Sequence, residues 1–265
     1  MMKWFELALV VLTFATGVTW LLDRLLFARR RAREAGLLEP KEPLVVDYAR
    51  AFFPVLFAVL ILRSFIAEPF RIPSSSMMPT LLIGDFILVN KFSYGIRLPV
   101  TNRKVIDLGE PERGDVVVFR PPHHPDQDWI KRVIGLPGDV VAYRDNTVYV
   151  NGEPFGYGPA RPYEGVGRGR EMTGAELVEE SLPGRSHHVL ETRRPGGFDP
   201  GEGEWRVPEG EYFVMGDNRD RSDDSRFWGT LPESQLRGKA FLVWMNLDST
   251  QPGWVDWGRI GRGIP

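Results

Sequence analysis

The sequence predicts a mainly β fold that follows two N-terminal transmembrane helices. Two long apolar runs lie within the first 66 residues, and the rest of the chain shows short apolar or β-branched runs between turn-forming residues. The 28 glycines and 22 prolines are many for a helical protein and suit a turn-rich β fold. The formal net charge of −2 argues against a nucleic-acid partner, and the absence of cysteine excludes thiolate catalysis, cysteine-bound zinc and disulfides.

The first apolar run covers residues 4–22, WFELALVVLTFATGVTWLL, and is interrupted only by Glu6. Roughly 20 apolar residues cross a bilayer as a helix. The alternative is a secretory signal peptide that is cleaved off. However, Asp23, Arg24 and FARRRAR follow the run, and a small-residue cleavage site does not. We therefore predict an uncleaved transmembrane helix within residues 1–22.

The second apolar run covers residues 51–62 and taken alone also fits a buried core helix. Extended to residues 48–66 it reaches a membrane-spanning length, because Arg50 and Arg63 near its ends can extend to the lipid headgroups. The predicted loop between the helices, residues 23–47, is strongly basic. The basic residues between positions 23 and 50 are Arg24, Arg29, Arg30, Arg31, Arg33, Lys41 and Arg50. The positive-inside rule then places the loop in the cytoplasm and everything after residue 66 beyond the outer face.

Strand predictions for the exported part rest on short runs bounded by turn signals such as IGD, RGD and NG. These runs are residues 86–89, 116–119, 140–143, 147–150, 212–215 and 240–245. Asp145-Asn146 and Asn151-Gly152 predict tight hairpin turns on either side of TVYV. Residues 94–114 are expected to form a longer hairpin.

Residues 152–209 differ from the rest of the exported part. They are polar, rich in glycine and proline, and lack long apolar runs. This composition predicts a smaller inserted subdomain, since surface loops tolerate insertions, and it leaves residues 67–151 and 210–265 as the core. After Asp248 the chain is expected to be a loop, with Trp254 and Trp257 packed or near the membrane interface, where tryptophan is enriched.

Residues 71–80, RIPSSSMMPT, hold three serines between two prolines, directly after the second apolar run. This stretch is either a polar hinge or the carrier of a reactive hydroxyl. The sequence has no Gly-x-Ser-x-Gly, Ser-x-x-Lys or His-Glu-x-x-His motif. Its histidines form the adjacent pairs His123-His124 and His187-His188 in loops rich in proline and glycine. Because neighbouring side chains point in different directions, we predict no metal site, and no cofactor is implied.

A serine nucleophile without histidine needs another base, and a lysine serves when burial lowers its pKa from about 10.4 toward 7–8. Lys131 is the best candidate, because in a strand it would share one face with Trp129 and Val133. The alternative is an amphipathic strand with a solvated lysine, and the pattern alone favours that alternative.

Four sequence boxes change this balance, because together they resemble the bacterial type I signal peptidases, also called leader peptidases. Residues 68–95, EPFRIPSSSMMPTLLIGDFILVNKFSYG, resemble the nucleophile box of that family, and PERGDVVVF at 111–119 is similar to its second strand box. IKRVIGLPGD at 130–139 resembles the lysine box, and GDNRDRSDDSRFWG at 216–229 resembles the C-terminal box. The order of the boxes and the preceding two helices match the family as well.

The resemblance implies an antiparallel β-sheet catalytic core and a Ser/Lys dyad, with Ser76 as nucleophile and Lys131 as general base. It assigns Ser74 to the oxyanion, with the backbone N–H of Ser76, and Ser222 to orienting the amine of Lys131. Arg132 is the basic residue usual beside the lysine, and Asp224 and Arg226 would form a supporting ion pair. For the walls of the substrate pockets we name the apolar residues flanking the dyad, Ile72, Met77, Leu81 and Ile130.

The implied activity is that of a membrane-bound serine endopeptidase that removes signal peptides from exported preproteins after small residues at positions −1 and −3. Its partners would be signal peptides and the lipid bilayer, without nucleic acid. We expect a monomer in the bacterial inner membrane, with the catalytic domain on the periplasmic face. Two alternatives stay open at this point. One is a self-cleaving serine–lysine regulator, although such proteins carry a DNA-binding module. The other is a membrane-anchored β-rich binding or scaffold protein without turnover.

Overall fold

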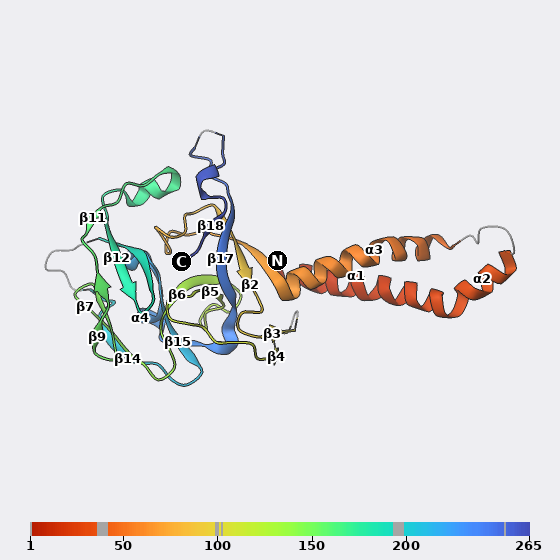
Figure 1. Ribbon diagram of the computed structural model, residues 1–265, viewed down its shortest axis with the longest axis horizontal. Coiled ribbons are helices and arrows are strands. Elements are labelled where there is room, and N and C mark those ends of the chain that lie inside the picture. Colours follow the sequence, from red (N-terminus) through yellow and green to blue (C-terminus); the bar gives the residue numbers. More distant parts are fainter. Residues whose placement is uncertain (1, 36–41, 99–100, 102, 193–198, 252) are drawn as a thin grey trace. The chain divides into compact units, whose positions relative to one another are not determined.

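The computed structural model describes residues 2–35, 42–98, 101, 103–192, 199–251 and 253–265. The chain divides into two compact units (Figure 1). We call residues Met1–Ala67 and Arg97–Val105 the helical unit, and residues Glu68–Ile96 and Ile106–Pro265 the β unit.

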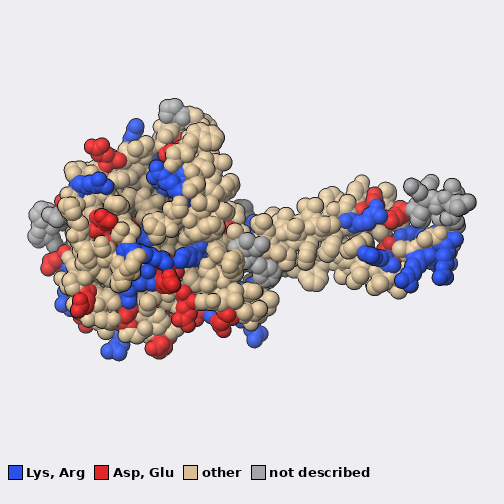
Figure 2. Space-filling model, in the orientation of Figure 1, with Lys and Arg blue, Asp and Glu red and all other residues tan. Residues whose placement is uncertain are grey.

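The helical unit contains two helices that are long and apolar enough to cross a membrane, Trp4–Arg33 and Leu44–Ser64. Their parts are α1 (Met2–Leu22), a π-helical turn (Asp23–Phe27), α2 (Ala28–Ala35), α3 (Leu44–Ile61) and a second π-helical turn (Leu62–Ile66). The first helix thus continues beyond Leu22, into the stretch predicted as a loop, and Lys41 of that stretch lies outside the described residues. Figure 2 shows a group of lysines and arginines around α2.

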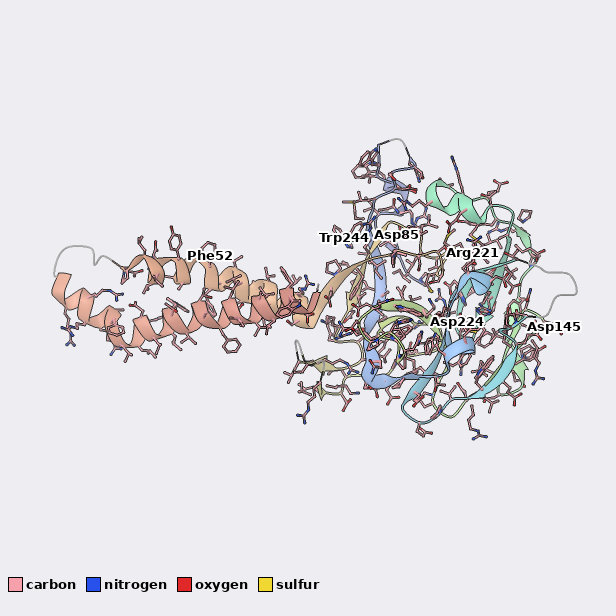
Figure 3. All side chains as sticks on the ribbon, turned by 180° about the vertical axis from the view of Figure 1, so that it is seen from behind. Phe52, Asp85, Asp145, Arg221, Asp224 and Trp244 are labelled. Carbon is pink, nitrogen blue, oxygen red and sulfur yellow. The ribbon has the colours of Figure 1, made fainter. Side chains whose placement is uncertain are left out.

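Close packing between α1 and α3 depends on a small residue. A Cβ atom at Gly17 would lie 2.7 Å from the Phe53 ring, so only glycine leaves room for that ring. Trp20 also packs on Phe53, with ring centroids 5.7 Å apart. Phe52, which directly precedes Phe53, is instead 55% exposed (Figure 3). Small residues allow the same close approach between helices in membranes, so the two helices pair as an apolar hairpin.

The main sheet of the β unit has the strand order β1-β2-β17-β5-β6-β15-β16, with β18 paired to β17. Strands β2, β17, β5, β6, β15 and β16 pair antiparallel in that order. The bounds are β1 (Ala67–Arg71), β2 (Asp85–Asn90), β5 (Val116–Phe119), β6 (Trp129–Gly135), β15 (Glu211–Met215), β16 (Leu231–Pro232), β17 (Leu236–Asn246) and β18 (Arg262–Gly263). The predicted fold class, mainly antiparallel β after two apolar helices, is confirmed.

A second sheet has the order β14-β7-β8-β9, with bounds Gly203–Arg206, Val140–Arg144, Thr147–Val150 and Glu153–Pro154. Both predicted hairpin turns are confirmed. Asp145 and Asn146, with φ of 47° and 59°, join β7 to β8, and Asn151 and Gly152, with φ of 53° and 85°, join β8 to β9 (Figure 3). Two successive left-handed residues form the turn that matches strand twist, and these residue types adopt that conformation readily.

Residues 152–209 contribute a third sheet, of order β10-β12-β11 with β13 paired to β12. Its strands are β10 (Gly156–Tyr157), β11 (Arg161–Pro162), β12 (Glu176–Leu182) and β13 (Arg185–Glu191), and a 3₁₀ helix (Gly167–Met172) precedes β12. We call β12 and β13 the insert hairpin. His187 and His188 lie in strand β13 and not in a loop, so the sequence interpretation of that pair was wrong.

Shorter elements complete the chain. These are β3 (Ile96–Arg97) and β4 (Lys104–Ile106), which form a two-stranded sheet within the predicted hairpin, helix α4 (Ser225–Trp228), and 3₁₀ turns at Arg219–Arg221, Glu233–Gln235 and Trp257–Arg259. Strand β6 lies between two hydrophobic clusters. Ile130 belongs to the cluster with Ile72, whereas Val133 and Trp129 belong to the cluster with Val117.

Candidate active site

The serine turn and strand β6 meet at one hydrogen bond. Lys131 Nζ donates to Ser76 Oγ at 2.9 Å. Lys131 is only 4% exposed and Ser76 8%. The alternative of a solvated lysine is therefore wrong, and the structure brings the predicted nucleophile and base into direct contact.

The surroundings of Lys131 set its protonation. Burial lowers the pKa of its amine from 10.5 to about 8, while the carboxylates of Asp224, Asp223 and Asp217 partly oppose this shift. The Trp129 ring centroid lies 5.5 Å from Nζ. Desolvation penalises the charged ammonium, so a substantial part of the amine is neutral in mildly basic solution.

Asn218 fixes the backbone of the serine turn. Its N–H donates to the carbonyl of Ser76 at 3.0 Å, and its Nδ2 donates to the carbonyl of Ser75 at 3.1 Å. Met78 N–H donates to the same Ser75 carbonyl at 3.0 Å. These contacts hold Ser76 in one position. Sequence reasoning assigned no role to Asn218, although it lies inside the recognised C-terminal box.

The predicted auxiliary serines lie close to the nucleophile. Ser74 Oγ is 3.5 Å from Ser76 Oγ. The Ser222 hydroxyl is buried and does not hydrogen-bond to the Lys131 amine, so this predicted contact is not formed. A Cβ atom at Gly216 would lie 2.3 Å from Ser222 Oγ and 2.5 Å from the Ser76 carbonyl oxygen. Only glycine lets both groups approach the backbone at this point.

Asp224 and Arg226 form the expected ion pair. Arg226 Nε donates to Asp224 Oδ1 at 2.8 Å and Nη2 donates to Oδ2 at 3.0 Å. The Gly216 N–H also donates to Asp224 Oδ2, at 3.0 Å. Burial by itself would raise the pKa of Asp224, but the Arg226 guanidinium outweighs this effect and holds that pKa below its usual value. The carboxylate therefore stays charged, and it braces the segment that carries Ser222.

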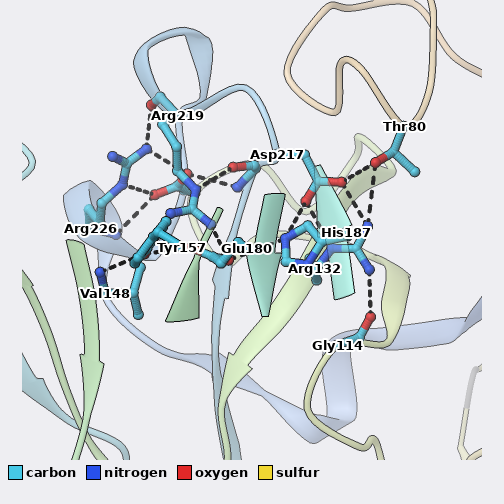
Figure 4. A network of polar contacts seen from close by, with 12 residues as sticks. Thr80, Gly114, Arg132, Val148, Tyr157, Glu180, His187, Asp217, Arg219 and Arg226 are labelled. Carbon is cyan, nitrogen blue, oxygen red and sulfur yellow. Dashed lines mark hydrogen bonds and ion pairs between the residues drawn. The ribbon is translucent and has the colours of Figure 1, made fainter. Parts of the chain in front are cut away.

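Arg132 is paired on the opposite face of β6. Its Nε and Nη2 donate to the two oxygens of Asp217 at 2.8 and 2.7 Å, and its Nη1 donates to the Gly114 carbonyl at 2.8 Å (Figure 4). Nη1 also donates to the backbone oxygen of Pro265 at 2.6 Å. Thr80 Oγ1 donates to Asp217 Oδ2 at 2.5 Å. Asp217 thus joins β6 to the end of the serine turn.

The four residues predicted to line substrate pockets lie in one hydrophobic cluster. Ile72 is 2% exposed, Met77 and Leu81 are 0% exposed, and Ile130 is 7% exposed. Met77 and Leu81 have no exposed surface for a ligand in this conformation, so here they act as core residues that pack behind the site. A role in selectivity stays a prediction for all four. Within the described parts of the chain, no group of three or more histidine, aspartate or glutamate side chains is arranged to hold a metal ion.

A buried serine hydroxyl bonded to a lysine of lowered pKa, on an antiparallel β unit preceded by two apolar helices, defines a membrane-anchored hydrolase with a serine nucleophile. The family described as "Signal peptidase, peptidase S26" matches residues 45–245. The chain belongs to this family of signal peptidases.

Similar proteins cover nearly the whole chain. "Signal peptidase I" of Pseudomonas fluorescens is 47% identical, over 91% of this chain and 92% of the relative. "Signal peptidase I" of Pseudomonas aeruginosa is 45% identical, over 97% and 98%. A crystal structure of a signal peptidase I from Enterococcus faecalis is 31% identical and covers 49% of this chain and 96% of that chain, with a TM-score of 0.29.

Proposed function

We propose that the protein removes signal peptides from exported preproteins, with Ser76 as the nucleophile and Lys131 as the general base. The observation that carries the proposal is the 2.9 Å hydrogen bond between Lys131 Nζ and Ser76 Oγ in a site where burial lowers the lysine pKa to about 8. Membership of the signal peptidase family supports the reaction class. The family also supports the substrate class.

The geometry supports a two-step acyl transfer. Neutral Lys131 takes the Ser76 proton while Oγ forms a bond to the carbonyl carbon at the cleavage site. As the tetrahedral intermediate collapses, the carbon–nitrogen bond breaks and the lysine returns the proton to the leaving amine. Water, deprotonated by the same amine, then attacks the acyl carbonyl carbon. The ester bond to Ser76 Oγ breaks, the lysine returns the proton to Oγ, and the signal peptide is released as a carboxylate.

Two donors would stabilise the negative charge on the oxygen of the intermediate. We assign them to the Ser74 hydroxyl and the Ser76 N–H, since Ser74 Oγ lies 3.5 Å from Ser76 Oγ. A single oxyanion donor typically contributes about 2.7–4 kcal/mol. Ser222, buried against Gly216, would orient the lysine amine once a substrate displaces the resting contacts.

We further propose a monomer in the bacterial inner membrane, with its β unit on the periplasmic face. The basic residues near α2 support this orientation through the positive-inside rule. Exposed aromatic residues of the β unit, including Trp254 (69% exposed) and Trp257 (77%), support contact of that unit with lipid. A small-residue preference at positions −1 and −3 of the substrate follows from the family assignment.

The proposal is tested by cleavage of a purified preprotein in detergent, with wild type beside Ser76→Ala and Lys131→Met. Cleavage after an Ala-x-Ala site by wild type alone, with both variants folded, is the expected result. We expect each variant to cleave at least about 10³-fold more slowly than wild type. A folded wild type that cleaves none of several preproteins would favour a binding protein, and full activity of Lys131→Met would show that another group is the base.

A further inference from the structure

The insert hairpin carries two buried polar residues that the mechanism above does not use. Glu180 on β12 and His187 on β13 are cross-strand partners, and they are 0% and 3% exposed. Both point into the β unit, toward the C-terminal box (Figure 4). Their neighbours His188 and Glu179 form the next cross-strand pair and are exposed. A buried pair of this polarity is costly unless its charges are compensated.

Compensation comes from the C-terminal box and from β6. Arg219 Nη2 donates to Glu180 Oε2 at 2.6 Å, and Tyr157 donates to Glu180 Oε1 at 2.7 Å. His187 Nε2 lies 3.2 Å from Glu180 Oε2 and 3.6 Å from Asp217 Oδ1. The imidazole therefore stands between the carboxylate of the insert and the carboxylate that holds Arg132 (Figure 4).

The charges balance when His187 is neutral. The carboxylates of Glu180 and Asp217 face it, and each is already paired with one guanidinium, of Arg219 and of Arg132. A protonated imidazole would add an unbalanced charge in a dry site. Burial, together with Arg132, lowers the pKa of His187. The imidazole is therefore neutral in neutral solution, and its Nε2 lies between the two carboxylates without a well-aligned hydrogen bond to either of them.

The backbone provides a second link in the same place. Leu190 N–H, on β13, donates to the Asp217 carbonyl at 2.8 Å. The next residue, Asn218, donates to the carbonyls of Ser76 and Ser75. Asp217 also accepts from Thr80, four residues beyond Ser76. Strand β13 thus supports both attachment points of the serine turn through residues 217 and 218.

We propose that His187, with Glu180, is a positioning residue for the reaction: it sets the place of the Asp217–Asn218 segment, and through it the place of Ser76 relative to Lys131. Two buried residues of the insert hairpin then support the position of the reacting groups, whereas its exposed residues do not. This inference rests on the proposed function, since it concerns the rate of that cleavage. A displacement of about 1 Å in a reacting group typically costs about 10²-fold in rate, so small movements at Asp217 would be visible.

The test compares His187→Leu, which keeps bulk but has no polar atom, with His187→Gln, whose amide group lies near the position of Nε2. His188→Leu, on the exposed side of the same strand, is the matched control. Steady-state cleavage of one preprotein in detergent gives kcat and KM, and thermal unfolding gives the folded fraction.

We expect His187→Leu to lower kcat about tenfold or more with KM changed by less than about twofold, and His187→Gln to recover kcat to within about threefold of wild type. His188→Leu should match wild type. Wild-type kcat in folded His187→Leu would overturn the inference. So would an equal loss in the Leu and Gln variants that follows the folded fraction, because that result describes a purely structural residue. Failure of wild type itself to cleave would instead overturn the proposed function.

Discussion

Lys131 and Arg132 are neighbours on β6 and nearly equally buried, at 4% and 1% exposed, yet the protein treats their charges in opposite ways. Arg132 is bonded to both oxygens of Asp217 and to two backbone oxygens. Lys131 donates to a serine hydroxyl and has an aromatic ring nearby. The strand alternation separates two faces, one with a counterion in contact and one without.

One strand thus carries two buried basic side chains, and only Arg132 is paired with a carboxylate. A guanidinium does not lose its proton in proteins, so burial of Arg132 requires a paired carboxylate. An ammonium without such a partner can respond to burial by losing its proton, and the lowered pKa of Lys131 is this response. Carboxylates near Lys131 keep its pKa at about 8 and prevent a lower value.

The largest effect is expected from breaking the paired face. Asp217→Asn would leave the buried Arg132 charge without its carboxylate, and loss of one partner of a buried pair typically costs about 3–5 kcal/mol. We expect the free energy of unfolding, measured by denaturant titration in detergent, to fall by that amount. Asp220→Asn, an exposed position in the same box, is the control and should change little. A loss below about 1 kcal/mol would show that the backbone oxygens of Gly114 and Pro265 satisfy Arg132 by themselves.

The surroundings of Lys131 could be predicted from the sequence better than the partners of Arg132. Alternation of Trp129, Lys131 and Val133 correctly indicated an apolar setting for the lysine, but only the resemblance decided against a solvated amine. The partners of Arg132 come from residues 114, 217 and 265, which local patterning cannot bring together. The hairpin turns at Asp145-Asn146 and Asn151-Gly152 were predictable because their chemistry is local.

The burial of His187 and its pairing with Glu180 were not predicted, although the sequence contained one indication of them. Its pairing with Glu180 depends on the register of β12 and β13, which the polar composition of the insert concealed. Along β12, Val178, Glu180 and Leu182 are buried at alternate positions. A charged residue in phase with apolar ones indicates a buried polar contact, although the identity of its partner requires the structure.

The second prediction concerns the free-energy cost of burying the Lys131 amine. A lysine whose pKa falls from 10.5 to about 8 on folding destabilises the folded state by about 3 kcal/mol at pH values below 8. We therefore expect Lys131→Met to be inactive but more stable by about that amount at pH 7. The wild type should gain stability as pH rises from about 8 to 10.5, where the unfolded chain binds more protons, and the variant should lack this rise.

Arg132→Met is the matched control for that experiment, one residue along the same strand. It should lose stability, because it leaves Asp217 without its guanidinium. Unfolding midpoints at several pH values distinguish the two variants. If Lys131→Met were as destabilised as Arg132→Met, the two faces of β6 would not differ in the way described.

The smallest expected effect adjusts the Lys131 face without breaking it. Asp223 is one of the carboxylates that raise the pKa of Lys131, and its side chain is 59% exposed. Asp223→Asn removes that charge, so the lysine pKa falls and the acid limb of the pH profile of kcat/KM moves to lower pH. Because solvent and salt screen an exposed charge, we expect kcat/KM near pH 7 to rise by less than about threefold, and the rise to shrink at high salt.

Above the lysine pKa the two rates should coincide, since the amine is then neutral in both proteins. Asp220→Asn, which removes a charge that is not among the main influences on Lys131, should leave the acid limb in place. If the acid limb moved to higher pH in Asp223→Asn, the group whose titration controls the rate would not be an amine whose pKa is raised by neighbouring carboxylates.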